Sequence, residues 1–424
     1  MIVYKFGGAS VKDAPGVENV ARILKTVPRQ DVVVVVSAMG KMTNAFEELV
    51  GVYRAGEDFS KQLKFIKDFH NKIAADLKLK DGSLKEKVEA IYSQLELELT
   101  KPSTDNADYD YDQLVCYGEM LSTQIVSEYL KPVGLENTLV DAREIIRTNN
   151  TYREANVKWE RTSELVNEKW KSVKEKATKD RAIMITQGFI GHTKERRSTT
   201  LGREGSDFSA AVLAYVLDAE SLSIWKDVPG VLNADPKHFP DAVKLKRISY
   251  REAIELAYFG ASVIHPKTIK PLQNKNIPLY VKPFQDFEEE GTIIEASTFS
   301  DSLIPSYIFK KDQILISFTP RDFSFVAEHN LSELFGIFAD NRIKINLMQN
   351  SALNFSVCVD YSETKLQKII NKCKERYEVL YNESCELVTI RHYDQETISR
   401  LLIGKKVLVE QRSRSTVRMV LQSD

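Results

Sequence analysis

Short apolar runs alternate with longer stretches of helical periodicity along the first part of the chain. Residues 2–6 read as an apolar strand, and residues 32–36 are five consecutive valines, as in a strand buried on both faces of a parallel sheet. A glycine turn and a helical pattern that reaches Leu24 lie between them. The order strand, turn, helix, strand predicts an α/β domain at the start of the chain.

The same alternation continues to about residue 297. Apolar positions three and four apart predict a helical hairpin over 59–102, broken near Asp81, and a helix over 114–130 after a polar loop at 103–112. Because no change of pattern interrupts this region, we expect one large α/β domain over residues 1–297. Further short strands are expected at 182–186, 221–225 and 278–282.

After residue 297 the order of elements changes. It becomes β-α-β-β-α-β, the order of a small ferredoxin-like unit, followed by helix, strand, strand, which look like a shortened second copy. We expect a linker over 298–312, a first unit over 313–385 and a shortened unit over 386–424. The expected elements are strands at 313–319, 344–348, 355–361, 387–391, 406–411 and 416–421, and helices at 325–341, 364–377 and 396–403.

The composition is that of a globular protein, with 43% hydrophobic and 28% charged residues. A formal net charge of −1 gives no overall field that would attract nucleic acid or an anionic membrane. No apolar run approaches the about 20 residues of a membrane span, and the first residues lack the pattern of a secretory signal. We therefore expect a cytoplasmic protein with no nucleic-acid or membrane partner.

Cysteine, histidine and glycine spacings exclude several kinds of site. The four cysteines form no C-x-x-C pair and the histidines are scattered, so reduced thiols and no resident metal are expected. No two glycines are separated by a single residue, which excludes the G-x-G-x-x-G dinucleotide fingerprint. Gly51 and Gly56 have P-loop spacing, but Glu57 stands where a lysine is needed. Any nucleotide site is of another kind.

The first candidate motif is Lys5-Phe6-Gly7-Gly8. A lysine at the end of a buried strand, followed by two glycines and a helix, places a cation beside backbone N–H groups. That combination is typical of an anion site, and phosphate fits it. The alternative is a tight turn with a solvated lysine.

The second motif covers residues 199–211. Arg203 lies between two glycines and could grip a carboxylate with its guanidinium, while Asp207 could orient a lysine or an ammonium group. The alternative is that Ser206 or Asp207 is only a helix N-cap.

A third segment, residues 224–237, contains Lys226 and Asp227 after a predicted strand. Open α/β sheets bind ligands at the carboxyl ends of their strands, although such a loop is usually only solvated. Glu119 follows Gly118 on a predicted helix, where a surface role is the usual one. His265 before a proline is interpreted as structural.

Taken in order, these segments resemble the aspartate kinases of the amino-acid kinase superfamily. Residues 5–11 are similar to the family's K-F-G-G-T-S-V signature, with Ala9 in place of threonine. The resemblance covers essentially the whole chain, because the family continues into C-terminal ACT regulatory modules. The other similar segments are 35–38, 43–44, 118–119, 186–191, 199–207, 225–236 and 259–266.

This resemblance implies an amino-acid kinase fold, with a mostly parallel central sheet between helices, followed by ferredoxin-like ACT units. It implies transfer of the γ-phosphoryl group of MgATP to the side-chain carboxylate of L-aspartate, giving 4-phospho-L-aspartate. That reaction is the first step of lysine, threonine and methionine biosynthesis. A carboxylate is already ionised at neutral pH, so positioning and charge neutralisation are the remaining work.

The resemblance also implies roles for particular residues. Lys5 bridges the phosphates beside Phe6, Gly7 and Gly8, and Asp207 orients Lys5. Mg²⁺ is bound mainly by the phosphates and water. The aspartate pocket contains Arg203 on the α-carboxylate, together with Thr43, Glu119, Phe189 and Ser206. The remaining nucleotide contacts are Ser37, Lys226, Asp227, Leu232 and Lys237.

Two departures from the family bear on the nucleotide site. The family's second lysine is replaced by Ser262, and a lysine, Lys226, stands where the family has threonine. We hypothesise that Lys226 supplies the missing cation. Leu232 replaces a common tyrosine, which puts the adenine contact in question.

The regulatory region also departs from lysine-inhibited relatives. Asn346 and Ala352 stand where those proteins carry acids for the effector's ammonium groups, while Ser351 remains. Without these carboxylates a cationic effector is left unpaired, so we expect weak or no lysine feedback. ACT units pair edge to edge across subunits, so the resemblance implies a homodimer.

Two other functions are compatible with parts of the sequence. Amino-acid kinases for glutamate, uridylate or carbamate lack the Gly118-Glu119 context and usually the ACT tail. A catalytically weak ACT-domain amino-acid sensor on a degenerate kinase fold is favoured by Ser262. The presence of Lys5, Arg203 and Asp207 argues against it.

Overall fold

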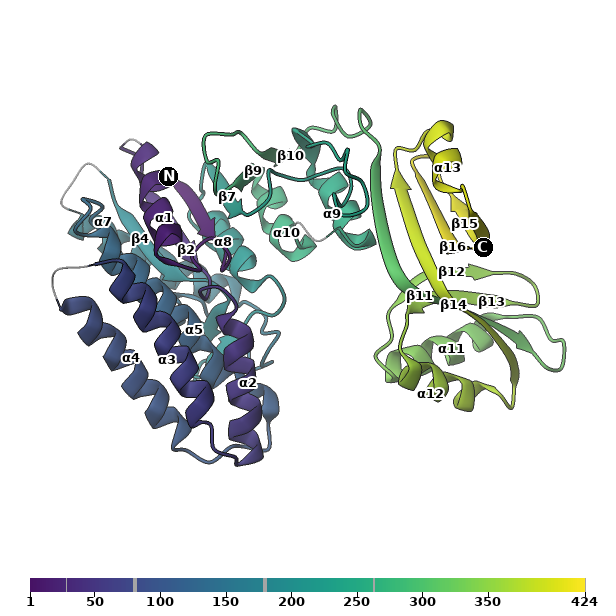
Figure 1. Cartoon of the computed structure of the whole chain (residues 1–424), viewed down its shortest axis with the longest axis horizontal. Helices are drawn as coiled ribbons and strands as arrows, with labels where there is room; N and C mark the ends of the chain where they lie inside the picture. The colour runs from purple at the N-terminus through teal and green to yellow at the C-terminus, as the bar shows by residue number, and fades with distance from the viewer. Residues whose placement is uncertain (28, 79–81, 178–180, 262–263, 424) are drawn as a thin grey trace. The chain divides into compact units, whose positions relative to one another are not determined.

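In a computed structural model the chain forms two compact units (Figure 1). The structure describes residues 1–27, 29–78, 82–177, 181–261 and 264–423. Unit 1 comprises 1–231, 244–254 and 263–298. Unit 2 comprises 232–243, 255–262 and 299–424. No helix in the described part of the chain is long and apolar enough to cross a membrane.

The described part of unit 1 contains an eight-stranded sheet in the order β3-β4-β2-β1-β7-β9-β10-β8. Every pairing is parallel except that of β9 with β10. This confirms the mostly parallel sheet. The strands are β1 (Ile2–Phe6), β2 (Val32–Val36), β3 (Thr138–Val140), β4 (Ile183–Gln187), β7 (Ser221–Lys226), β8 (Arg247–Ser249), β9 (Leu279–Pro283) and β10 (Thr292–Glu295).

Helices pack around this sheet in two groups. In the first group, α2, α3, α4 and α5 pack together, and α1 lies beside α3 and α5. In the second group, α8 packs with α7 and α10 and contacts the central strands. The helices are α1 (Ala14–Thr26), α2 (Met42–Ala55), α3 (Ser60–Asp76), α4 (Ser83–Leu99), α5 (Ala107–Leu130), α6 (Ala142–Ile145), α7 (Trp159–Lys176), α8 (Gly205–Val216) and α10 (Pro266–Lys275). Helix α9 (Tyr250–Phe259) has residues in both units. A short hairpin of β5 (Ile190–His192) and β6 (Ser198–Thr200) precedes α8.

The expected helical hairpin is confirmed by α3 and α4, although Asp81, near which the break was expected, lies outside the described residues. The expected loop at 103–112 is wrong, because α5 already begins at Ala107. Asn106 caps this helix by accepting from the amides of Asp108 (3.1 Å) and Tyr109 (3.0 Å). The polar residues that suggested a loop are acids in the first turn, where the helix dipole favours negative charge.

Within its described residues, unit 2 contains a six-stranded antiparallel sheet in the order β12-β13-β11-β14-β16-β15. In Figure 1, β11 and β14 run the length of this sheet, with α11 and α12 near one end and α13 near the other. The elements are β11 (Ser306–Pro320), α11 (Glu328–Asp340), β12 (Ile345–Asn350), β13 (Phe355–Asp360), α12 (Glu363–Cys373), β14 (Tyr377–Arg391), α13 (Gln395–Leu401), β15 (Lys405–Arg412) and β16 (Thr416–Ser423).

Unit 2 contains two modules, a βαββαβ module inserted into a second module whose strands are parts of β11 and β14 together with β15 and β16, with helix α13. The second half of β11, with α11, β12, β13, α12 and the first half of β14, has the ferredoxin-like strand order. The first half of β11 pairs with the second half of β14, from Ser306 opposite Arg391 to Lys310 opposite Leu387. Residues 306–312, expected to be linker, therefore supply a strand to the second module. That strand lies beside β14, which pairs in turn with β16.

Candidate active site

Two lysines and one aspartate meet at the carboxyl ends of β1 and β7. Lys5, the last residue but one of β1, is 7% exposed, and its Nζ lies 2.5 Å from Oδ1 of Asp207. Lys226 ends the neighbouring strand β7, and its Nζ lies 3.4 Å from Oδ2 of the same carboxylate. The motif containing Asp207 therefore reaches Lys5, and two cations share one anion.

The protonation state of this group follows from its partners. Asp207 is 2% exposed, in the first turn of α8. Burial acts to raise the pKa of Asp207, but the ammonium groups of Lys5 and Lys226 outweigh it and hold the pKa below its usual value. The three groups together carry a net positive charge at the sheet edge where ligands bind in open α/β folds. An anion is the ligand that this charge favours.

The glycine turn after β1 packs closely on the turn after β2. A Cβ on Gly8 would lie 2.6 Å from the carbonyl oxygen of Ala38 and 2.9 Å from that of Gly40. The Gly40 amide in turn donates to the Gly8 carbonyl oxygen (2.9 Å). Gly7 has more room, since its Cβ would meet Lys5 Nζ only at 3.6 Å. The second glycine is thus required by backbone packing.

Glu119 lies on α5 beside the turn after β2, and one of its carboxylate oxygens has no partner among the described residues. The residue is 2% exposed, and its Oε1 accepts only a long bond, 3.4 Å, from the Ala38 amide. Oε2 has no hydrogen-bond partner among the described residues. Burial raises the pKa of Glu119 to about 8. A buried carboxyl group without a cationic partner is suited to a ligand's ammonium group.

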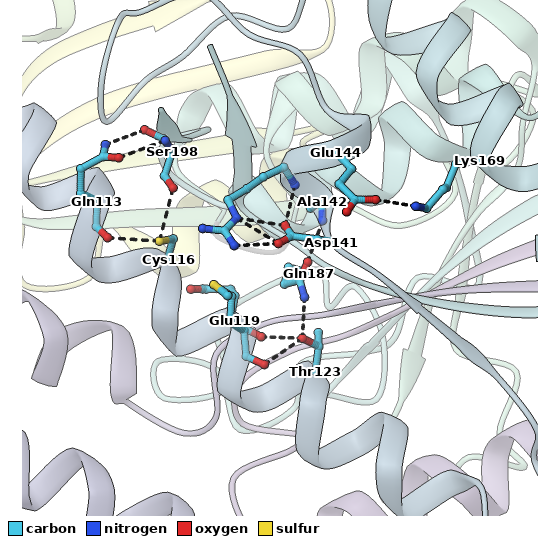
Figure 2. Close-up of polar contacts among 12 residues, drawn as sticks. Gln113, Cys116, Glu119, Thr123, Asp141, Ala142, Glu144, Lys169, Gln187 and Ser198 are labelled. Carbon is cyan, nitrogen blue, oxygen red and sulfur yellow. Dashed lines mark hydrogen bonds and ion pairs between the residues drawn. The ribbon is translucent and has the colours of Figure 1, made fainter. Parts of the chain in front are cut away.

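Hydrogen bonds from α5 to neighbouring elements hold Glu119 in place (Figure 2). One turn further along α5, Thr123 accepts from the Gln187 amide at 2.8 Å, and Gln187 accepts from the Ala142 amide at 2.7 Å. Ser122 donates to the Ser37 carbonyl oxygen at 2.7 Å. The helix is thereby bonded to β4, to the start of α6 and to the turn after β2.

Arg203 is presented on a tight turn before α8. Gly202 has φ +76° and Glu204 has φ +52°, so the chain reverses around Arg203. The Arg203 side chain is exposed, and its guanidinium makes no bond to any residue that the structure describes. A cation on a tight turn with its donors available is suited to a carboxylate.

Phe189 and Ser206 flank the same turn. Phe189 adopts φ +69°, and its amide donates to Ser209 Oγ at 2.9 Å. A Cβ on Gly188 would lie 2.5 Å from Ser206 Cβ, so this glycine allows the strand to approach α8. Thr43 is the second residue of α2, after the turn that contacts Gly8.

Of the other sequence-predicted nucleotide residues, two lie beside this site and two lie outside unit 1. Ser37 follows β2, where its amide donates to the Phe6 carbonyl oxygen at 3.1 Å, and Asp227 is exposed after β7. Leu232 and Lys237 belong to unit 2, so the geometry of unit 1 does not include them. Ser262 lies outside the described residues.

The candidate effector residues differ in their surroundings. Asn346 is 8% exposed and bonded on both sides: its Oδ1 accepts from Lys310 Nζ at 2.9 Å, and its Nδ2 donates to Gln313 (2.9 Å) and Asp360 (2.8 Å). Ser351 and Ala352 lie in the exposed turn between β12 and β13. Asn346 is thus committed to a network within the chain.

Sequence reasoning did not single out one buried carboxylate of unit 1, that of Asp112, which is 0% exposed on α5. It fell in the segment expected to be a loop. Its distance of seven residues from Glu119 could have indicated a shared helix face. No group of three histidine, cysteine or acidic residues suited to a metal ion occurs within the described ranges.

Comparison with known proteins identifies the family. The family model described as "Amino acid kinase family" matches residues 1–283. Aspartokinase 2, chloroplastic, of Arabidopsis thaliana is 30% identical over 384 residues, 88% of this chain and 69% of its own length. Lysine-sensitive aspartokinase 3 of Escherichia coli (strain K12) is 30% identical over 361 residues, 85% of this chain and 78% of its own.

Solved structures of related proteins share the fold over nearly the whole chain. Escherichia coli aspartokinase III in complex with lysine and aspartate has a TM-score of 0.82 at 26% identity, covering 100% of this chain and 96% of that one. The same enzyme with aspartate and ADP has a TM-score of 0.81 at 27% identity, covering 99% and 96%. The chain belongs to the amino acid kinase family, and within it to the aspartokinases.

Proposed function

We propose that the chain transfers the γ-phosphoryl group of ATP to the side-chain carboxylate of L-aspartate, giving 4-phospho-L-aspartate and ADP. The main observation behind this proposal is that one edge of the mostly parallel sheet presents two kinds of binding group. It presents the Lys5–Asp207–Lys226 cluster for an anion, and behind the adjoining turn it presents the unpaired buried oxygen of Glu119 for an ammonium group. Solved relatives that bind aspartate and ADP with this fold support the assignment.

The reaction needs no general base, because the attacking carboxylate is ionised at neutral pH. Lys5 donates to the phosphates and neutralises charge that develops during transfer, and Asp207 holds its ammonium group in place. Lys226 adds a second cation to the same carboxylate. Because Asp207 pairs with two cations at once, neither ammonium group is fully neutralised by it.

Substrate is held by groups of opposite sign. Glu119 pairs with the α-ammonium group and Arg203 with the α-carboxylate, while Thr43, Phe189 and Ser206 complete the pocket. This leaves the side-chain carboxylate of aspartate directed to the nucleotide. Mg²⁺ would accompany ATP and be held mainly by the phosphates and water, because Asp207 already has two ammonium partners and Glu119 is assigned to the substrate's ammonium group.

Unit 2 is proposed to be regulatory and to pair two copies of the chain into a homodimer. A lysine-sensitive relative and a lysine-bound solved relative support an amino-acid effector. The sheet of unit 2, with its ferredoxin-like module inserted into a second module, is the part of this chain suited to that role.

The test is ADP release with MgATP and L-aspartate, compared with L-glutamate and with no amino acid. Aspartate-dependent release is expected, and Lys5→Met should lower it by about a hundredfold or more. ATP binding without turnover on any amino acid would favour the sensor interpretation and contradict the kinase assignment.

A further inference from the structure

Asp112, near the start of α5, is bonded to two chain segments that lead to Arg203. Its side chain is 0% exposed. Oδ1 accepts from Thr200 Oγ1 at 2.7 Å, and Oδ2 accepts from the backbone amides of Thr200 (2.8 Å) and Arg153 (3.0 Å). One carboxylate therefore joins α5 to the end of β6 and to the loop that precedes α7.

These two segments lie directly beside the turn that carries Arg203. Thr200 ends β6, and its carbonyl oxygen accepts from the Ala155 amide at 2.9 Å. A Cβ on Gly202 would lie 3.3 Å from the Arg153 carbonyl oxygen. Because the loop packs this closely under Gly202, its position determines the path of the chain into Arg203.

Other residues in the first turns of α5 support the same region. Gln113 pairs with both backbone groups of Ser198, donating to the carbonyl at 2.9 Å and accepting from the amide at 3.1 Å (Figure 2). The Arg153 guanidinium lies 4.0 Å from the ring centroid of Tyr111 and donates to Glu47 of α2 at 2.8 Å. Helix α5 therefore holds β6 and the loop together.

Asp112 and Glu119 are seven residues apart on α5, so they lie two turns apart on one face of the helix. We propose that Asp112 is a positioning residue for aspartate binding, which holds Arg203 in register with Glu119 so that one substrate molecule meets both. The inference rests on the proposed function, since it takes Glu119 and Arg203 as substrate contacts. Asp112 itself touches no substrate.

Asp110 provides a matched control. It lies on the same helix and is 4% exposed. Its carboxylate pairs with Arg54 and accepts from the amide and the hydroxyl of Thr104. None of these contacts leads to Arg203. Replacement of Asp110 should lower the stability of the protein as replacement of Asp112 does, but without a specific change in the KM for aspartate.

The experiment compares Asp112→Ala with Asp110→Ala in steady-state kinetics and thermal unfolding. Asp112→Ala should raise the KM for aspartate by about tenfold or more while the KM for ATP stays within about twofold, because only the position of Arg203 is lost. Asp110→Ala should lower Tm without changing either KM by more than about twofold. Equal effects of the two variants on the aspartate KM would overturn the proposal.

Two milder variants keep the test decisive if Asp112→Ala fails to fold. Asp112→Asn should restore most of the aspartate affinity, because its amide oxygen can accept from both backbone amides while the Thr200 hydroxyl accepts from its NH₂ group. Thr200→Val removes one donor and should raise the aspartate KM alone. A wild-type aspartate KM in a folded Thr200→Val variant, or an equal rise in its KM values for aspartate and ATP, would also reject the positioning role.

A double variant separates this inference from the proposed function. If Asp112 acts through Arg203, then Asp112→Ala should raise the aspartate KM no further in an Arg203→Ala background. Full additivity would mean that Asp112 acts by another route. An Arg203→Ala variant with an unchanged aspartate KM would instead reject the substrate contact itself, and no aspartate-dependent turnover in the unaltered chain would reject the proposed function.

Discussion

At the scale of single residues, the site contains carboxyl groups in opposite electrostatic states. Asp207 is flanked by two ammonium groups, which hold its pKa below the usual value despite burial. Burial raises the pKa of Glu119 to about 8, and one of its oxygens has no hydrogen-bond partner among the described residues. Residue types and motifs could indicate both positions, but burial and partners decide the charge. That is why the unpaired oxygen of Glu119 could not be predicted from the sequence.

The raised pKa of Glu119 predicts a pH-dependent aspartate affinity. Its folded pKa lies above that of an exposed glutamate, so its ionisation costs stability as the pH rises toward 8, and a bound ammonium group relieves that cost. The KM for aspartate should therefore fall as the pH rises from about 6 to 8, and binding at neutral pH should release a proton. Calorimetry in buffers of different ionisation enthalpy measures that release.

Glu119→Gln should raise the aspartate KM and remove both effects. Glu128→Gln is the control, because Glu128 is a buried acid of the same helix already paired with Lys87 and Lys131. Proton release that persists in Glu119→Gln would contradict the assignment of this titration to Glu119.

Lys226 offers a second prediction at the residue scale. Removal of a charge-assisted contact costs about 1.5–3 kcal/mol, so Lys226→Ala should lower kcat or raise the KM for ATP by roughly ten- to hundredfold. Lys275→Ala, which removes a surface ion pair with Asp218, should change neither. Wild-type turnover and ATP affinity in Lys226→Ala would refute the hypothesis that this lysine replaces the family's missing cation.

At the scale of elements, the sequence predicts most strands and helices but misplaces some of their ends. The five valines of β2 and the two helices of the hairpin match their predictions, because buried runs and helical periodicity are local signals. The start of α5 was missed because a capped, acidic first turn has the composition of a loop. The length of β11 was missed because the charged residues at its middle, 310–312, interrupt the apolar pattern while the strand continues.

The close contact between the turns after β1 and β2 predicts unequal tolerance of two glycines. Gly8→Ala should lower Tm strongly and abolish activity, because its Cβ has no room beside the Ala38 and Gly40 carbonyl oxygens. Gly51→Ala on α2, where a Cβ meets nothing within 4 Å, should be neutral or stabilising by up to about 1 kcal/mol. Thermal unfolding of both variants checks this, and a Gly8→Ala variant with wild-type Tm would show that the turns can separate at little cost.

At the scale of the whole molecule, the chain combines a phosphoryl-transfer unit with a sheet of two nested modules. The sequence indicates both parts, but not that residues before the first module belong to the second. Strand pairing between residues about 80 positions apart leaves no local pattern. The nesting therefore emerges only from the three-dimensional arrangement.

The side-chain contacts of unit 2, the unit proposed to be regulatory, predict weak control by lysine. Asn346 is bonded to Lys310, Gln313 and Asp360, so it offers no free acceptor to an effector's ammonium group. Lysine at millimolar concentration should change turnover little, and Asn346→Asp should not create sensitivity, because the new carboxylate would pair with Lys310 and lie beside Asp360. A titration of initial rate with lysine checks both, and micromolar inhibition of the unaltered chain would contradict the prediction.

The strands shared by the two modules of unit 2 also limit how genes that encode this arrangement can recombine. Since β11 and β14 each contribute one half to either module, no single crossover can separate the two modules without dividing the second one. An exchange that begins after residue 312 keeps the first half of β11 from the recipient protein. That strand then has to pair with the second half of β14 from the donor protein. The segment from the start of β11 to the end of β16 is therefore expected to be inherited as one block, together with any effector specificity that it carries. Chimaeras that exchange this whole segment are the ones expected to fold.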